Sequence, residues 1–87
     1  MSYQVLVSRT FQKQFAGLES SLQERVKTAL KNLKEDPFRS RPKADIKQIK
    51  GTHPPKYRVR IGKYRAVYTV EGDKVKVIEI FARGREY

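Results

Sequence analysis

The strongest constraint on the fold is a pair of alternating segments on either side of Gly62. In residues 56–61, KYRVRI, and in residues 64–70, YRAVYTV, every second side chain is apolar or aromatic. Successive side chains of a β-strand point to opposite faces of a sheet, so each segment predicts a strand. Gly62 and Lys63 then form the turn between them. The pattern therefore predicts a β-hairpin in the second half of the chain.

Three arginines share one side of this hairpin. Arg58 and Arg60 alternate with the apolar side chains of the first strand, and Arg65 on the second strand can share their face. If helices cover the apolar face, the three guanidinium groups lie together on the face that the helices leave bare. We expect a patch of arginines positioned by rigid backbone.

The remaining periodicity predicts an α+β fold in the order β-α-α-β-β-β. Residues 2–8 alternate as a first strand, and residues 74–82 as a last one. Between the first strand and the hairpin, apolar side chains at helical spacing predict a short helix, residues 11–18, and a longer helix that Pro37 ends. We expect this helical hairpin to pack on one face of a twisted, mostly antiparallel four-stranded sheet, and residues 1–87 to form a single domain.

The segment 37–50 has no such period. It contains two prolines and several cations, and we expect it to be irregular, with Ile46 and Ile49 anchoring it to the core. Residues 37–65 hold ten basic residues against one acidic residue, Asp45, within a chain of net charge +11. A field this one-sided favours a polyanionic partner, and nucleic acid is the first candidate.

Several other chemistries are excluded or disfavoured by composition. The chain has no cysteine and one histidine, His53, so neither a thiolate nor a histidine metal site is expected, and no glycine-rich phosphate loop is present. Glu79 lies in the last predicted strand, where a cross-strand partner for a cation is its more ordinary role. The N-terminal apolar run is too short to cross a bilayer. We expect a soluble cytoplasmic protein that needs no cofactor and contacts no membrane.

The chain resembles the RelE/ParE superfamily of toxins from bacterial and archaeal toxin–antitoxin systems. The resemblance covers nearly the whole chain and is strongest in the spacing of tyrosines and basic residues from Tyr57 to Tyr68. Its other elements are the sequences LKEDP, IKQIKG and the closing ARGREY. The archaeal type of RelE is the branch that the sequence resembles most.

This resemblance implies a ribosome-dependent mRNA endonuclease that works without a metal. Such a toxin enters the ribosomal A site and directs the 2′-hydroxyl of the RNA at the adjacent phosphate, which leaves a cyclic phosphate and a 5′-hydroxyl. The resemblance also implies a RelB-like antitoxin that wraps the toxin and neutralises it. The ribosome, mRNA and the antitoxin are therefore the expected partners.

The resemblance also assigns roles to individual positions. Arg58 and Arg60 match the catalytic lysines of the family's hairpin strand, Arg65 would stabilise the transition state, and Arg83 would contact phosphate and donate a proton. Tyr87 would stack on or orient the substrate. Further contacts to RNA phosphates are expected from Lys50, Lys56, Lys63 and Arg85.

The identity of the general base is open at this point. Arginines replace the lysines of some relatives, and arginine releases a proton poorly. Lys56, Glu79, Glu86 or a solvent hydroxide are the candidates. The other alternative is that positioning and charge stabilisation carry most of the rate. Two alternatives to the nuclease also stay open: a ParE-like inhibitor of DNA gyrase without nuclease activity, and a non-catalytic basic module that binds RNA or the ribosome.

Overall fold

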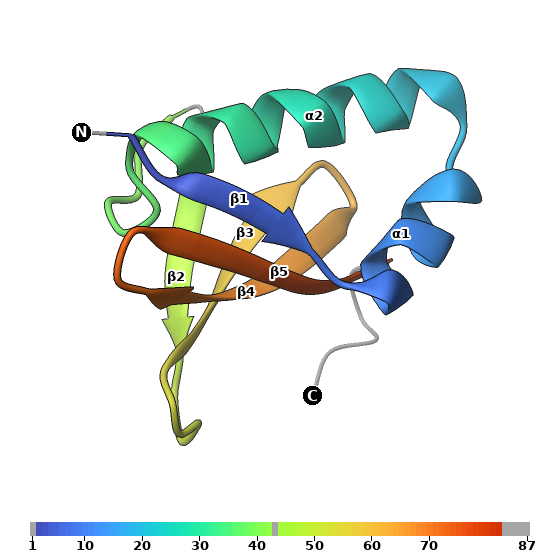
Figure 1. The fold of residues 1–87 in the computed structure, drawn as a ribbon. Helices are drawn as coiled ribbons and strands as arrows, with labels where there is room; N and C mark the ends of the chain where they lie inside the picture. Colours follow the sequence, from blue (N-terminus) through green and yellow to red (C-terminus); the bar gives the residue numbers. More distant parts are fainter. Residues whose placement is uncertain (1, 43, 83–87) are drawn as a thin grey trace.

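The computed structural model describes residues 2–42 and 44–82. Two helices lie against one face of a five-stranded sheet, and none of these residues forms a helix on the opposite face (Figure 1). The elements, in chain order, are β1 (Gln4–Val7), α1 (Arg9–Ala16), α2 (Ser20–Glu35), β2 (Asp45–Ile49), β3 (Lys56–Ile61), β4 (Tyr64–Glu71) and β5 (Lys74–Ala82). The predicted α+β class, the helical hairpin and the strand hairpin at Gly62 are confirmed.

The sheet has the strand order β1-β5-β4-β3-β2. The strands β2, β3, β4 and β5 pair antiparallel with their neighbours, whereas β1 pairs parallel with β5. The first and last strands of the chain are therefore adjacent, and β2 forms the opposite edge of the sheet. A sheet that is mostly antiparallel, as predicted, can leave one face open to solvent.

The prediction of four strands was wrong, because residues 45–49 form β2 rather than an irregular segment. All five residues pair with β3, from Asp45 opposite Arg60 to Ile49 opposite Lys56. Only Ile46 of the strand is buried, and its neighbour on the same face, Gln48, is exposed. One buried side chain gives no alternating pattern, so this strand leaves little signal in the sequence.

The core lies between the helices and the covered face of the sheet. Val26 and Leu33 of α2 are fully buried, and they belong to the same apolar cluster as Val59 of β3 and Ala66 and Tyr68 of β4. The alternation of β3 and β4 therefore puts the apolar side chains under the helices. It follows that the intervening side chains of these strands point to the open face.

Two polar contacts attach α1 to the last strand. Ser8 caps the helix by accepting a hydrogen bond from the Phe11 amide, and its hydroxyl also donates to the carbonyl oxygen of Ile78. The amide of Ile80 donates to Gln14 Oε1 at 2.7 Å. Side chains of the first helical turns thus fix the second half of β5, which borders the open face.

The segment between α2 and β2 is attached to the C-terminal end of α2 and to the central strands. Arg41 donates hydrogen bonds to the carbonyl oxygens of Asn32 and Asp36, at 2.8 and 3.1 Å, at the C-terminal end of α2. The Tyr68 hydroxyl donates to Pro37, and the Phe38 ring packs edge-to-face on Tyr57, with 5.5 Å between ring centroids. These contacts fix the position at which β2 begins beside β3.

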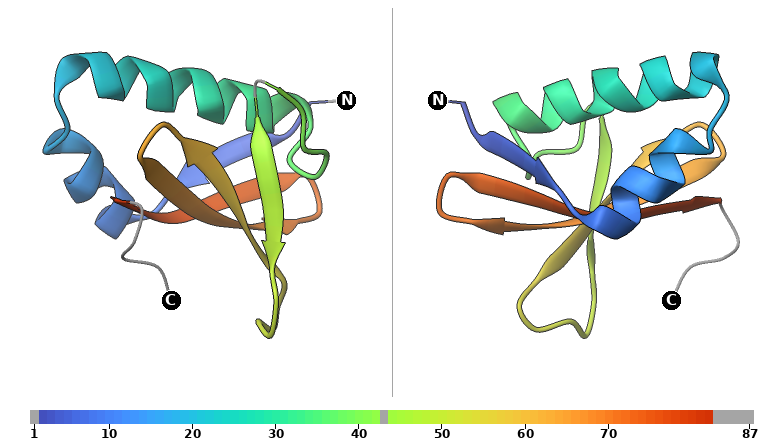
Figure 2. Two further views of the ribbon diagram at one scale, coloured as in Figure 1. Left: turned by 180° about the vertical axis from the view of Figure 1, so that it is seen from behind. Right: turned by 45° about the vertical axis from the view of Figure 1, so that its right-hand side comes forward.

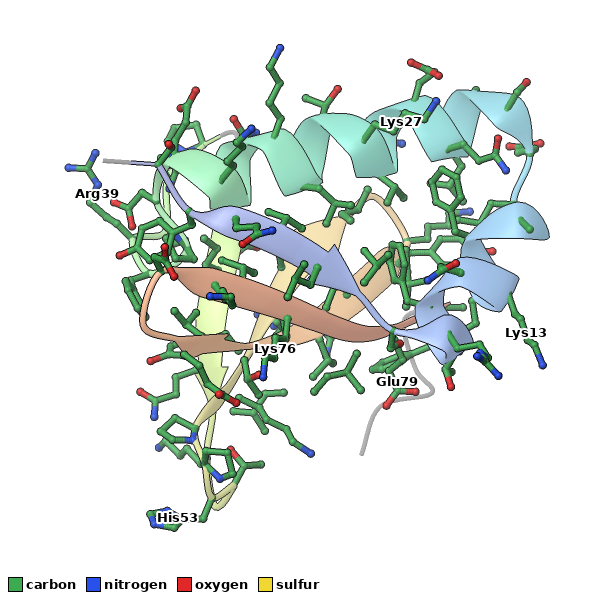
Figure 3. All side chains as sticks on the ribbon, in the orientation of Figure 1. Lys13, Lys27, Arg39, His53, Lys76 and Glu79 are labelled. Carbon is green, nitrogen blue, oxygen red and sulfur yellow. The ribbon has the colours of Figure 1, made fainter. Side chains whose placement is uncertain are left out.

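The connection between β2 and β3 projects away from the helices, as both views in Figure 2 show. Figure 3 places His53 at the tip of this connection, while Lys76 and Glu79 of β5 point away from α2. His53 is exposed.

Candidate nucleic-acid interface

The pairing of strands brings Arg58 and Arg65 to the open face of the sheet. Residues directly opposite one another in an antiparallel pair share a face. Arg58 lies opposite Val67, and Arg65 lies opposite Phe81 of β5. Neighbouring pairs such as Val59 and Ala66 are buried on the helix side. The two arginines therefore lie on the face of the sheet opposite to the one that α1 and α2 cover.

Arg58 and Arg65 line one shallow hollow on this face, which we call the open-face hollow. Its volume is about 170 Å³, and it is lined by Lys47, Gln48, Ile49, Arg58, Arg65, Val67 and Phe81. Cationic side chains and the apolar residues Val67 and Phe81 therefore line the same hollow. A hollow of this composition can hold the phosphate of a nucleotide against the guanidinium groups and its base against the apolar residues.

Both arginines are held by their surroundings. The side chain of Arg58 is only 16% exposed, and its Nη1 atom donates to the backbone oxygen of Asp45 at 3.4 Å. The Nε atom of Arg65 is buried in the sheet surface. Side chains fixed in this way lose little conformational entropy when they bind a ligand.

Arg60 departs from the predicted patch. It lies directly opposite Arg65 on the neighbouring strand, yet it lines a different and larger cavity of about 740 Å³ at the seam with α2. Arg25, Thr28, Ala29 and Asn32 of α2, together with Gly62, line the same cavity, which we call the seam cavity. The three hairpin arginines are therefore neighbours, but they are divided between two adjoining hollows.

Asp45 connects these two hollows. Its carboxylate forms an ion pair with Arg58, at 3.6 Å from Oδ1 to Nη1, and one with Arg60, at 3.8 Å from Oδ2 to Nη1. The sequence identified this residue only as the single acid of a basic segment. Its place beside the arginines depends on β2, the strand that the sequence did not predict.

The cationic side chains of the site repel one another. Arg60 lies directly opposite Arg65, and Lys47 lies directly opposite Arg58. Like charges in such positions destabilise a sheet. Asp45 offsets part of this repulsion, and a bound polyanion would offset more.

The predicted lysines are not gathered at the open-face hollow. Lys56 begins β3 opposite Thr69, and Lys50 is an exposed turn residue after β2. Lys63 lines a separate hollow beside the start of α2. Lys47, which the sequence reasoning missed, is the lysine that lines the open-face hollow. Lys47 lies two residues after Asp45, so in a strand both side chains point to the same face. This spacing is the signal in the sequence that could have identified Lys47.

The C-terminal candidates Arg83, Arg85, Glu86 and Tyr87 lie outside the described residues. The last described strand ends at Ala82, next to Phe81, which lines the open-face hollow. Within residues 2–42 and 44–82, no group of three or more His, Cys, Asp or Glu side chains could hold a metal ion. In the same part of the chain, no helix combines the length and apolar character needed to cross a membrane.

Residues 5–87 match the family described as "ParE toxin of type II toxin-antitoxin system, parDE". The chain belongs to the RelE/ParE toxin superfamily. This RelE/ParE protein is 34% identical over 71 residues to Toxin RelE3 of Methanocaldococcus jannaschii, a match that covers 82% of this chain and 80% of the relative.

Two solved structures place the RelE/ParE chain in the archaeal RelE branch. The archaeal RelE–RelB complex from Pyrococcus horikoshii superposes with a TM-score of 0.83 at 28% identity, over 99% of this chain and 100% of that one. The RelB–RelE antitoxin–toxin complex from Methanococcus jannaschii gives a TM-score of 0.72 at 28% identity, over 88% of each chain. The protein is therefore a toxin of a type II toxin–antitoxin system, as the sequence resemblance predicted.

Proposed function

We propose that this toxin is a ribosome-dependent mRNA endonuclease. It cleaves mRNA in the ribosomal A site, where the 2′-hydroxyl of one nucleotide attacks the adjacent phosphate. The observation that carries the proposal is the open-face hollow, which Arg58 and Arg65 line together with the apolar residues Val67 and Phe81. The proposal treats residues 1–87 as one toxin domain that acts in the cytoplasm, where ribosomes translate.

The chemistry of this reaction fits the residues of the hollow. RNA supplies its own nucleophile, so the protein has to align the hydroxyl with the phosphate and stabilise the charge of the pentavalent transition state. Arg65 and Arg58 supply positive charge and directed N–H donors for the non-bridging oxygens. Phe81 offers a face for the base, which keeps the nucleotide in register with the arginines.

Arg60 has a supporting role in this proposal. It lines the seam cavity and shares the Asp45 carboxylate with Arg58, so it would contact from that side a phosphate that Arg58 also binds. Lys47 would bind RNA beside Arg58, whereas Lys50, Lys56 and Lys63 would contribute to the long-range field. The roles of Arg83, Arg85 and Tyr87 rest on the family resemblance alone. Lys56, Glu79, Glu86 and a solvent hydroxide remain the candidates for the general base.

A RelB-like antitoxin is the proposed protein partner. Two structural relatives at 28% identity are complexes of RelE with RelB, and this chain covers 88% or more of each. An antitoxin neutralises this toxin by covering the cationic face or by competing for its arginines.

Primer extension on mRNA bound to programmed ribosomes tests the proposal. The wild-type protein is expected to cut in the A-site codon, and a 2′-O-methyl group on the attacking nucleotide is expected to block the cut. Arg65→Ala and Arg58→Ala are each expected to lower the cleavage rate by roughly 100-fold or more, the usual loss when a transition-state donor is removed. Arg83→Ala is expected to do the same.

Arg39→Ala is the matched control. The Arg39 side chain is 78% exposed, and Figure 3 shows it pointing into solvent at the C-terminal end of α2. This variant loses the same charge and is expected to cleave normally. Full activity in both Arg65→Ala and Arg58→Ala would contradict the proposal.

The matched family model bears the ParE name, so gyrase inhibition is the second candidate. A supercoiling assay with purified gyrase separates the two. Inhibition of gyrase without any cleavage of ribosome-bound mRNA would support the ParE-like activity. Binding to ribosomes with neither effect would leave a non-catalytic RNA-binding module.

A further inference from the structure

Asp45 occupies a position that an RNA phosphate would be expected to take. Its two carboxylate oxygens face two different arginines, with Oδ1 toward Arg58 and Oδ2 toward Arg60. A phosphodiester likewise presents two anionic oxygens that can each accept from one guanidinium group. We propose that Asp45 is a built-in counter-ion of the RNA site, held between Arg58 and Arg60 in the free toxin and displaced by an RNA phosphate. This inference rests on the proposed function, because it assumes that RNA is the ligand.

The ion pairs of Asp45 with Arg58 and Arg60 are longer than direct charge-assisted hydrogen bonds. Charge-assisted hydrogen bonds between arginine and carboxylate are normally about 2.7–2.9 Å long. The Asp45 pairs measure 3.6 and 3.8 Å, and the Asp45 side chain is 49% exposed. The carboxylate therefore lies close enough to neutralise charge but forms no short bond that a phosphate would have to break.

The free toxin needs such a counter-ion. Arg58 and Lys47 oppose one another on β3 and β2, and Arg60 and Arg65 oppose one another on β3 and β4. The Arg58 side chain is 16% exposed, so water screens its charge poorly. An acidic side chain between Arg58 and Arg60 lowers this repulsion until a ligand replaces it.

The seam cavity offers space for the displaced Asp45 side chain. Asp45 also lines the seam cavity of about 740 Å³, so its carboxylate can turn away from Arg58 into open space. The backbone oxygen of Asp45 accepts from Arg58 Nη1 at 3.4 Å, and this contact does not depend on the carboxylate. Arg58 can therefore keep its place in the open-face hollow after the carboxylate has moved.

The role predicts opposite changes in stability and in binding. Asp45→Asn keeps the shape of the side chain but removes its charge, so the arginines lose their counter-ion and the free protein loses stability. The same change removes a competitor of the phosphate, so RNA binds more tightly. A residue that only supported the fold would lower stability and leave RNA binding unchanged or weaker.

Binding of a short single-stranded RNA to the full chain tests this. The probe carries 2′-O-methyl groups so that it cannot be cut, and fluorescence anisotropy gives Kd. Asp73→Asn is the matched control, because Asp73 also pairs with a cation, Lys74 at 3.5 Å, but lies in the exposed turn between β4 and β5. Both variants change the net charge equally.

Asp45→Asn is expected to bind roughly three- to tenfold more tightly than Asp73→Asn, the effect of one unit charge near a phosphate in largely aqueous surroundings. Its melting temperature is expected to fall below that of the control. Asp45→Ser is the second variant, and it is expected to show the same tighter binding if Asp45→Asn fails to fold. Equal Kd values for the control and the folded Asp45 variants would overturn the inference.

The outcome is distinguishable from a failure of the proposed function. If wild-type toxin cleaves ribosome-bound mRNA but the Asp45 variants bind RNA no more tightly than the control, the nuclease stands and the counter-ion role falls. If the Asp45 variants bind more tightly but no protein cleaves mRNA, the counter-ion role stands at a site that binds RNA without cutting it.

Discussion

The Tyr68 hydroxyl donates a hydrogen bond of 2.6 Å to the carbonyl oxygen of Pro37, 31 residues earlier in the chain. Tyr68 is fully buried on the helix-covered face of β4, and its ring stacks on Tyr57 with 5.7 Å between centroids. This contact ties the central hairpin to the segment that leads from α2 into β2. It therefore helps to determine where β2, and with it Asp45, lies against β3.

Tyr68→Phe is expected to destabilise the protein by about 1–3 kcal/mol, because it leaves the buried Pro37 carbonyl without its donor. For a domain of this size, each kcal/mol corresponds to a fall of roughly 4–8 °C in Tm. Calorimetry or thermal circular dichroism measures the change.

The Tyr68 ring faces the core, so the same variant is expected to bind the RNA probe normally below its melting temperature. Tyr64→Phe is the control. Tyr64 is a half-buried tyrosine of the same strand, but the donor to the Pro37 carbonyl is Tyr68. A Tyr68→Phe protein as stable as Tyr64→Phe would contradict the structural role.

Asp36 is expected to contribute to the stability of the protein at neutral pH and to lose this contribution in acid. The Phe38 and Arg39 amides donate to Asp36 Oδ1 at 3.0 and 3.2 Å, and these two bonds lower the pKa of the carboxyl. A carboxyl whose pKa is lowered by folding adds stability above its unfolded pKa. That contribution is lost as the pH falls through the lowered value.

Wild-type protein is therefore expected to exceed Asp36→Ala in stability at pH 6, by at most about 1 kcal/mol because the site is exposed. The difference is expected to shrink below about pH 4, where the unfolded carboxyl protonates. Urea unfolding of both proteins from pH 2 to pH 7 measures it. A difference that stays constant over this range would show that the carboxylate charge has no part in it.

Lys47 is expected to contribute to the salt dependence of RNA binding. It lines the open-face hollow with Arg58 and Arg65, so it should release a condensed cation when RNA binds. For single strands, each phosphate contact contributes about −0.7 to the slope of log K against log salt. Lys47→Ala is expected to make the slope shallower by about that amount.

Lys74→Ala is the control for this experiment. Lys74 is also an exposed strand lysine, but it lies at the start of β5, beside the turn at Gly72 and far along the strand from Phe81. Titrations of the RNA probe at four or five salt concentrations compare the slopes. If Lys47→Ala and Lys74→Ala give the same slope as wild type, Lys47 makes no phosphate contact.

The main elements of the fold were predictable because their signals are local. The alternation of residues 56–61 and 64–70 determines which side chains can be buried together, and Gly62, with φ of 59°, permits the tight turn between them. The helical spacing that includes Val26, Ala29 and Leu33 likewise marks the buried face of α2. The family could also be identified, since these elements and their spacing occur together over nearly the whole chain.

The strand β2 was not predictable in the same way. It buries one residue, Ile46, and its other four residues are polar or only half-buried, so the segment has no period of its own. It is a strand because its backbone pairs with β3. This pairing, and not the β-propensity of its own residues, determines its conformation. The missed strand also hid Asp45 and Lys47, whose places in the site follow from that pairing.

The sequence by itself determined which face of the hairpin carries its arginines, because side-chain direction along a strand alternates with period two. Only the tertiary structure decided that Arg58 and Arg65 share one hollow while Arg60 lines another cavity beside α2, with Asp45 paired to both Arg58 and Arg60. The physical reason is that alternation sets the face of a residue but not its neighbours. Those are set by the edge strand and the helix that pack beside it, whose positions depend on contacts between residues far apart in the chain.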